Sequence, residues 1–205
     1  MSVDKKNKRI SKALTFQLRH GGERHGLPLD SQGWADVESL LAMPQFSGVD
    51  IATIKNIVLS CPKQRFALKE EENKLYIRAN QGHSLKNVQV DLEELTSSTI
   101  PEILIHGTYE QYWSSIKSQG LSRMTRQHIH LATGITGAAG TISGVRATCD
   151  IHVYVDGLRA LTDGYKFFKS ANNVILCPGD DRGFLPPSYF ARVVNAKSGA
   201  DVPLL

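Results

Sequence analysis

The sequence predicts an α+β fold divided into two lobes. Over residues 7–60, apolar side chains recur at three- and four-residue steps, which is typical of amphipathic helices. Residues 103–194 instead hold short apolar strands around a single clear helix, a pattern that favours an α+β lobe over a doubly wound sheet. Residues 86–101 lose this periodicity and end on Ser, Thr and Pro, so we expect lobes of residues 1–97 and 98–205.

The first lobe opens with three predicted helices. The apolar stripe of the first helix, residues 7–20, consists of Ile10, Ala13, Leu14 and Leu18, and Gly21 and Gly22 end it. We expect Asp36 to cap the second helix. The third helix, residues 48–60, is expected to bury Ile51, Ile54 and Val58.

Residues 65–79 predict a β-hairpin. Phe66 and Ile77 alternate with polar neighbours on either side of the polar turn "EEENK". Because Phe66 faces the core, Arg65 is expected to point the other way. Three helices followed by a hairpin are the layout of a small winged-helix-like lobe.

The second lobe is expected to contain five short strands and one helix. The strands are predicted at residues 103–106, 128–132, 151–155, 173–177 and 189–194. The helix is predicted from Tyr109 to Gln119, with Thr108 as its cap and Gly120 as the residue that ends it.

The composition is ordinary for a soluble globular protein. The net charge of +4 permits a polyanionic partner, but a mildly basic surface with no nucleic-acid role stays open. The three cysteines are odd in number and far apart, which predicts reduced thiols and no zinc site. No apolar run reaches membrane-spanning length, so we expect a soluble, intracellular protein without membrane contact.

Basic side chains stand at three notable places. Arg19 and His20 are adjacent where the first helix ends, Arg65 opens the hairpin, and Arg146 precedes the strand at 151–155. Arginine offers a planar fork of donors that matches phosphate oxygens. Each residue taken alone is also compatible with a structural role, because a cation in the last helical turn is favoured by the helix dipole.

Histidines gather on the predicted strands. His106 is followed by Gly107, which leaves room for a ligand near the backbone, and by Thr108. His128 and His130 alternate on one strand face; a metal site there is an alternative, but no cysteine or carboxylate accompanies them. The chain has no GxGxxG, Walker A or GxSxG pattern, so any NAD binding would not use a Rossmann fold.

Seven strings of the sequence, in order, resemble one family. They are "ISKALTFQLRHG", "KQRFAL", "RANQGHS", "LIHGT", "HIHLA", "ISGVR" and "FFKSANNVILCPGDDRGFLPPSYF", and they cover nearly the whole span 10–194. The chain is similar to the RNA 2′-phosphotransferases, the KptA-like family. This resemblance implies a winged-helix-like RNA-binding lobe, followed by an NAD-binding lobe with the split β-sheet of ADP-ribosyltransferases.

The resemblance also implies a reaction. Such enzymes remove the internal 2′-phosphate at a tRNA splice junction by transferring it to NAD, through a 2′-phospho-ADP-ribosylated RNA intermediate. The products are RNA with a 2′-hydroxyl, ADP-ribose 1″,2″-cyclic phosphate and nicotinamide. NAD is thus expected as a consumed co-substrate and tRNA as the partner, with neither a metal nor an obligate protein partner.

By motif, the essential residues of the family fall on Arg19, His20, Arg65 and Arg146. The resemblance leads us to expect that Arg19 and His20 grip the RNA-side phosphate, while Arg65 and Arg146 stabilise the phosphoryl oxygens during transfer. The residues expected to bind NAD are His106, Gly107, Thr108, Ser115, Ile116, Gly120, Leu121, His130, Leu131, Ser170 and Asn172.

Two other functions remain open at this point. One is an ADP-ribosyltransferase that modifies terminal phosphates of nucleic acids, which would share the first chemical step. The other is a non-catalytic winged-helix nucleic-acid binder whose second lobe senses NAD.

Overall fold

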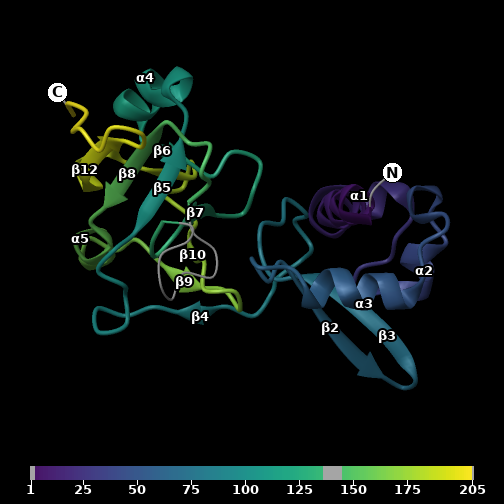
Figure 1. Cartoon of the computed structure of the whole chain (residues 1–205). Coiled ribbons are helices and arrows are strands. Elements are labelled where there is room, and N and C mark those ends of the chain that lie inside the picture. Colours follow the sequence, from purple (N-terminus) through teal and green to yellow (C-terminus); the bar gives the residue numbers. More distant parts are fainter. Residues whose placement is uncertain (1–2, 136–144, 205) are drawn as a thin grey trace. The chain divides into compact units, whose positions relative to one another are not determined.

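A computed structural model describes residues 3–135 and 145–204 of the chain. The chain divides into two compact units, Met1–Asp91 and Leu92–Leu205, which are described separately (Figure 1). Helices and several small antiparallel sheets occur together, so the fold is of the α+β kind that the sequence predicts.

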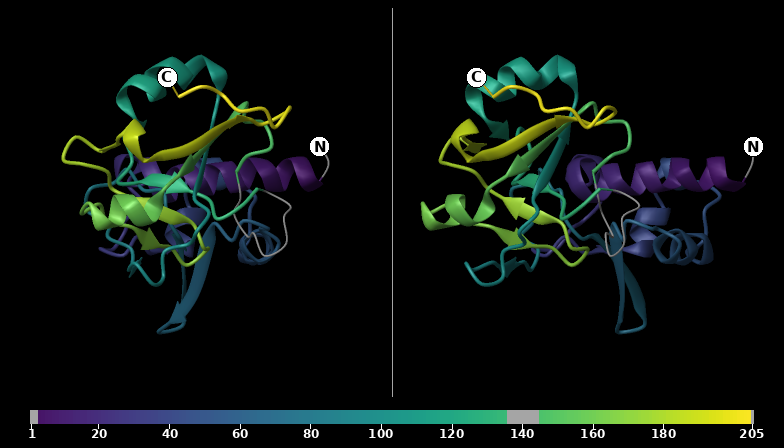
Figure 2. Two further views of the ribbon diagram at one scale, coloured as in Figure 1. Left: turned by 90° about the vertical axis from the view of Figure 1, so that its left-hand side faces the viewer. Right: turned by 60° about the vertical axis from the view of Figure 1, so that its left-hand side comes forward.

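The helices of the first unit are α1 (Val3–Phe16), a π-helix (Gln17–Gly21), α2 (Val37–Leu41) and α3 (Ile51–Leu59), with short 3₁₀ turns at Glu23–His25 and Pro44–Phe46. Figure 2 shows α1 as one continuous helix that leads in from the N-terminus. The first helix is longer than predicted at its N-terminal end, and its last turn widens into the π-helix.

Side-chain caps start the second and third helices. Asp36 accepts a hydrogen bond from the Ser39 amide at 2.9 Å, as predicted, and Asp50 does the same for α3. The predicted apolar face of α3 is partly wrong. Ile54 and Ile57 are the buried pair, whereas Ile51 lies in the exposed first turn.

The first unit has one three-stranded sheet, in the order β1 (Ala35–Asp36), β3 (Lys74–Ala79) and β2 (Phe66–Glu71). The predicted hairpin is confirmed: β2 pairs antiparallel with β3. Phe66 and Ile77 are buried, so the inward face of the sheet closes over the helices. The core that results consists mainly of Ile10, Leu14, Leu18, Leu27, Val37, Leu40, Phe46, Ile54, Ile57, Phe66 and Ile77.

The described part of the second unit contains three small sheets. Its strands are β4 (Glu93–Glu94), β5 (Ile105–Thr108), β6 (Leu121–Ser122), β7 (Ile129–Leu131), β8 (Ile151–Val155), β9 (Phe168–Lys169), β10 (Ile175–Cys177), β11 (Phe184–Leu185) and β12 (Phe190–Asn195). Their orders are β4-β9-β10-β7, β11-β6 and β12-β8-β5. In Figure 1, β8 lies between β5 and β12, and the helices are α4 (Glu110–Gln119) and α5 (Gly157–Thr162), with a 3₁₀ turn at Pro187–Tyr189.

The predicted helix and strands of this unit are present, with two corrections. The first strand begins at Ile105 and runs to Thr108, later than predicted, because its partners in β8 are Ile151–Tyr154. Thr108 is therefore part of β5 and does not cap α4. The N-cap position is Tyr109, with no side-chain cap, and the Glu110 amide donates to Asp150 at 3.4 Å.

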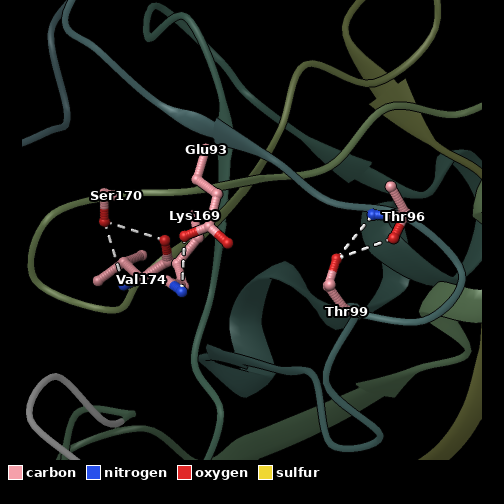
Figure 3. A network of polar contacts seen from close by, with 6 residues as sticks. All are labelled: Glu93, Thr96, Thr99, Lys169, Ser170 and Val174. Atoms are coloured by element: carbon pink, nitrogen blue, oxygen red, sulfur yellow. Dashed lines mark hydrogen bonds and ion pairs between the residues drawn. The ribbon is translucent and has the colours of Figure 1, made fainter.

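The division between the units lies ahead of the expected residue 97 because β4 pairs with β9. Glu93 lies opposite Lys169 and forms an ion pair with it at 2.7 Å (Figure 3). The adjoining turn closes by a hydrogen bond from the Thr96 amide to the Thr99 hydroxyl at 2.9 Å. These contacts tie residues 92–97 to the second unit.

Two further features bear on the expectations from composition. Cys61, Cys149 and Cys177 are all buried and unbridged, as predicted. Burial raises the pKa of the Cys177 thiol to about 11, so this sulfur is a neutral core group. In the part of the chain that the structure describes, no helix is both long and apolar enough to cross a bilayer.

Candidate active site

Arg19 and His20 lie in the π-helix that follows α1. The amide of Gly22 donates to the Gln17 carbonyl at 2.8 Å, a five-residue step in place of the four-residue step of an α-helix. Arg19 is buried to 8% exposure and His20 is half-buried. Arginine is almost never fully buried unless it is paired, so Arg19 differs from a cation that caps a helix at the surface.

The segment Asn80–Ser84 lies against this π-helix. The Ser84 amide donates to the Arg19 carbonyl at 2.9 Å, and the Ser84 hydroxyl lies 3.4 Å from the same oxygen. Nδ1 of His20 lies 3.0 Å from the Ser84 hydroxyl. With that hydroxyl donating to the carbonyl, its oxygen accepts from His20 Nδ1–H, which sets the tautomer and orientation of the imidazole.

Gly82 in this segment adjoins the Arg19 side chain. It has a φ of +90°, and a Cβ there would lie 3.2 Å from Nη1 of Arg19. Both the backbone conformation and the close approach favour glycine. The Arg19 guanidinium therefore packs directly against the backbone of Gly82.

The same segment holds the backbone of Arg65. The Asn80 amide donates to the Arg65 carbonyl at 2.9 Å, and the Asn80 side chain donates to the Gln64 carbonyl at 2.6 Å. Nη1 of Arg65 lies 3.5 Å from Sγ of Cys61. Asn80–Ser84 thus contacts Arg19, His20 and Arg65, which brings three predicted site residues around one five-residue segment.

Ser84 gives a first test of this arrangement. Ser84→Ala removes the partner of His20 Nδ1, so we expect kcat to fall about 5- to 10-fold, the usual worth of one hydrogen bond. Steady-state kinetics with a 2′-phosphorylated RNA measure kcat, with Ser60→Ala as the control. An unchanged kcat would contradict this role for Ser84.

In the second unit, His106 on β5 is oriented by a strand carbonyl. Its Nδ1 lies 3.0 Å from the backbone oxygen of His130. A carbonyl only accepts, so Nδ1 carries the proton, and in the neutral ring Nε2 is an acceptor. Burial lowers the pKa of His106, against the His130 contact, and the nearby charges of Arg126 and Arg146 lower it further. The ring is therefore neutral at pH 7.

A basic pocket of about 330 Å³ lies beside His106. It is lined by His106, Ser122, Arg123, Met124, Thr125, Arg126, His128, Ile129 and His130. None of these described lining residues is a carboxylate, so the two arginines give the pocket a positive potential. Its volume is in the range of small-molecule sites.

Neither pocket arginine forms an ion pair with an acidic residue in the part of the chain that the structure describes. Nη1 of Arg123 donates to the Arg126 carbonyl at 3.3 Å, and Nε of Arg123 is buried with no hydrogen-bond partner among the described residues. Burial lowers the pKa of Arg126, with a further contribution from Arg146. Burial and Arg123 together lower the pKa of His128 to about 4. These shifts indicate a region that favours an incoming anion.

Arg146, the fourth predicted catalytic residue, belongs to this second unit. Its side chain is exposed, and its charge acts on both His106 and Arg126. Residues 142–144 of the "ISGVR" string lie outside the described residues. Arg146 thus accompanies the NAD-binding candidates, while Arg19, His20 and Arg65 form their own group in the first unit.

Gly107 has a packing role that its sequence context did not indicate. The space that a side chain of residue 107 would take is filled, because a Cβ there would overlap Cγ1 of Val145 and lie 2.8 Å from Sγ of Cys149. The approach of a ligand to the Gly107 backbone stays a prediction. The absence of a side chain lets Val145, the neighbour of Arg146, pack against β5. Gly107 therefore helps to position Arg146.

Gly107→Ala is expected to lower both stability and turnover. Overpacking costs about 1–3 kcal/mol of unfolding free energy, and the displaced Val145 carries Arg146 with it. Thermal unfolding and kcat measure the two effects. The double variant Gly107→Ala/Val145→Ala removes the overlap with Val145 and should recover part of both, because the close approach to Sγ of Cys149 remains. Failure of the double variant to recover either would contradict this packing role.

The other predicted NAD residues are placed variously. Leu121 and Leu131 are core side chains, and Ile116 packs against the same core. Gly120 ends α4 with a φ of +98°, where a Cβ would overlap the Leu185 carbonyl. Ser115 is exposed on α4, and Thr108 is buried in β5. The roles of these residues in NAD binding stay predictions.

Ser170 and Asn172 lie in the buried turn between β9 and β10. The Ser170 hydroxyl donates to Oδ1 of Asn172 at 3.0 Å. It also accepts a hydrogen bond from the Val174 amide at 3.1 Å (Figure 3). Both side chains are almost wholly buried. These contacts stabilise the turn, and a role of either residue in NAD binding stays a prediction.

Sequence reasoning missed several residues of this arrangement. Ser84 and Asn80 lie in the quoted string "RANQGHS", but nothing local says that they contact Arg19 and Arg65. Arg123 and Arg126 carried a signal, since they stand just before the predicted strand 128–132. Within residues 3–135 and 145–204, no cluster of three potential metal ligands occurs.

Comparison with known proteins identifies the family of the chain. The family model described as "RNA 2'-phosphotransferase, Tpt1 / KptA family" matches residues 5–179. The chain is 46% identical to "tRNA 2'-phosphotransferase 1" of Danio rerio over 193 residues, which cover 92% of this chain and 86% of that protein.

More distant relatives agree. The identity is 36% to "tRNA 2'-phosphotransferase" of Saccharomyces cerevisiae, over 86% of this chain and 80% of that protein. It is 37% to "Probable RNA 2'-phosphotransferase" of Hahella chejuensis, over 96% of this chain and all of that protein. From the match over most of its length and these identities, the chain belongs to the RNA 2′-phosphotransferase, Tpt1 / KptA family.

Proposed function

We propose that this protein is an NAD-dependent RNA 2′-phosphotransferase that removes the splice-junction 2′-phosphate from tRNA. Family membership and the names of the relatives support the reaction. The observation that carries NAD use is the carboxylate-free basic pocket beside His106 in the second unit. In this proposal the first unit is a winged-helix-like RNA lobe and the second an ADP-ribosyltransferase-like NAD lobe.

The pocket residues suit the chemistry of a dinucleotide. Arg123 and Arg126 have donors without carboxylate partners among the described residues, and a pyrophosphate supplies matching acceptors. Nε2 of the neutral His106 is an acceptor suited to a ribose hydroxyl. These three side chains would hold and orient NAD, which supplies the ribosyl carbon that receives the phosphate.

Arg19, His20 and Arg65 would bind the RNA 2′-phosphate. Their contacts with Asn80–Ser84 fix their backbones in advance, so little ordering remains when the phosphate arrives. Holding a nucleophile in line with its target is worth up to ~7–11 kcal/mol of the barrier. In the first step a phosphate oxygen bonds to C1″ of the ribose, and the bond from C1″ to nicotinamide breaks.

In the second step the ribose 2″-oxygen bonds to phosphorus, and the bond from phosphorus to the RNA 2′-oxygen breaks. The proton of the 2″-hydroxyl is balanced by the proton that the RNA 2′-oxygen gains. Arg65 and Arg146 would stabilise the charge that gathers on the phosphoryl oxygens. His20, whose Nδ1 contacts the Ser84 hydroxyl, would give the proton to the leaving 2′-oxygen.

The proposal is tested by mixing the purified full chain with NAD and a short RNA that carries one internal 2′-phosphate. We expect equal amounts of nicotinamide, 2′-hydroxyl RNA and ADP-ribose 1″,2″-cyclic phosphate. Release of inorganic phosphate without NAD would overturn it. A matched RNA with only a terminal phosphate is the control, and its ADP-ribosylation in place of 2′-phosphate removal would favour the alternative transferase.

A further inference from the structure

One exposed face of α1 carries a row of cations that ends in an aromatic ring. Lys5, Arg9, Lys12 and Phe16 follow one another at steps of four, three and four residues. At about 100° per residue, these four positions fall within an arc of about 60° on the helix. All four are exposed, and the buried stripe lies on the opposite face.

The row is not neutralised by the protein. None of Lys5, Arg9 and Lys12 forms an ion pair with any residue in the described part of the chain. The one acidic residue of α1 is Asp4, which lies off the row. Exposed helix cations usually alternate with acids, so this row presents a net positive stripe.

Phe16 ends the row and is unusually exposed for a phenylalanine, at 48%. Its ring centroid lies 6.3 Å from that of His20 and 5.9 Å from that of His25. The ring also packs over the backbone of Gly21, where a Cβ would overlap it. The exposed face is therefore held in place, beside a residue already assigned to the 2′-phosphate.

We infer that this row binds the RNA that flanks the 2′-phosphate. Phosphodiesters would contact Lys5, Arg9 and Lys12, and the base next to the reacting nucleotide would stack on Phe16. Aromatic rings beside basic side chains are the usual platform for unpaired nucleotides. The row is about 16 Å long at 1.5 Å per residue, so it spans a few nucleotides. This inference rests on the proposed function only in taking RNA as the substrate.

The cations are tested with the triple variant Lys5→Gln/Arg9→Gln/Lys12→Gln on two substrates. One is a 2′-phosphorylated tRNA, and the other is a trinucleotide with the same internal 2′-phosphate. We expect the KM for tRNA to rise about tenfold, while the trinucleotide is turned over as by the unaltered protein. The slope of log affinity against log salt should become shallower by about 2, since ~0.7–0.9 is lost per phosphate contact.

The matched control replaces three exposed lysines off the row, as Lys74→Gln/Lys86→Gln/Lys197→Gln, with the same change in net charge. An equal loss in this control, or an unchanged salt slope in the row variant, would overturn the inference. If the unaltered protein turns over neither substrate, the proposed function fails instead. The two failures are thus distinguishable.

Phe16 is tested on the trinucleotide. Phe16→Ala should raise its KM about 5- to 100-fold, the usual effect of losing one stacked base, without changing the KM for NAD. Phe16→Trp keeps a ring and should keep a low KM. Leu59→Ala, another exposed apolar side chain of the first unit, is the control. Loss in the tryptophan variant equal to that in the alanine variant would overturn the stacking role.

Discussion

Replacing Arg146 with alanine is expected to lower kcat by about 100- to 1,000-fold while RNA still binds. Removing one preorganised donor from a developing oxyanion commonly has this effect. Arg146 is exposed, so its loss leaves the fold intact, yet its charge reaches His106 and Arg126. RNA binding should persist because Arg19, His20 and Arg65 are unaltered. Single-turnover kinetics and fluorescence anisotropy with a 2′-phosphorylated RNA measure the two properties.

Arg182→Ala is the matched control, because Arg182 is an exposed arginine of the same unit. It should leave both turnover and binding unchanged. A non-catalytic NAD-sensing protein would show no turnover to lose. Equal loss of RNA affinity and of kcat in Arg146→Ala would contradict the role assigned to this side chain.

Arg65→Lys is expected to fail nearly as badly as Arg65→Ala, each with kcat lowered by about 100-fold or more. A lysine keeps the charge but replaces the planar fork with a single point of contact. The backbone of residue 65 is held by the Asn80 amide at 2.9 Å, so the shorter reach of an ammonium is not easily recovered by movement of the strand. Steady-state kinetics with the short RNA compare the two variants.

Cys61→Ala is the control for this pair. It removes the sulfur that lies 3.5 Å from Nη1 of Arg65 but leaves the guanidinium. We expect kcat to change little, which would separate the fork itself from its neighbour. Near-normal turnover in Arg65→Lys would overturn the two-point contact.

Much of the first unit could be predicted because its signals are local. Asp36 caps a helix and the "EEENK" turn closes a hairpin through interactions within a few residues. The face of α3 was partly wrong because Ile51 stands in an exposed first turn, which its periodicity could not reveal. The two-residue strands β1, β4, β6, β9 and β11 were missed because pairing with distant partners creates them.

The candidate site shows the same difference between residues that local motifs predict and contacts that only the folded chain creates. Family strings located Arg19, His20 and Arg65, but His20 and Ser84 are 64 positions apart, and no periodicity predicts their contact. The packing role of Gly107 was missed because Val145, far along the chain, fills the space where a Cβ of residue 107 would lie. Arg123 and Arg126 become candidate binding residues only because they line the same pocket as His106. Candidate site residues could be predicted from their type and motif, but the distant residues that contact and orient them could not.

The π-helix has a consequence for how the enzyme matures. Its widened turn leaves the Arg19 carbonyl to a partner from beyond the hairpin, the Ser84 amide. A nascent chain that has emerged only as far as α3 has the arginine but nothing to anchor it. The Arg19 carbonyl therefore gains its partner only after residues 80–84 have been synthesised and have docked. In the folded protein the Ser84 amide is hydrogen-bonded to the Arg19 carbonyl, so its hydrogen exchange should be slow. In a chain that has not yet formed this contact, the same amide should exchange fast.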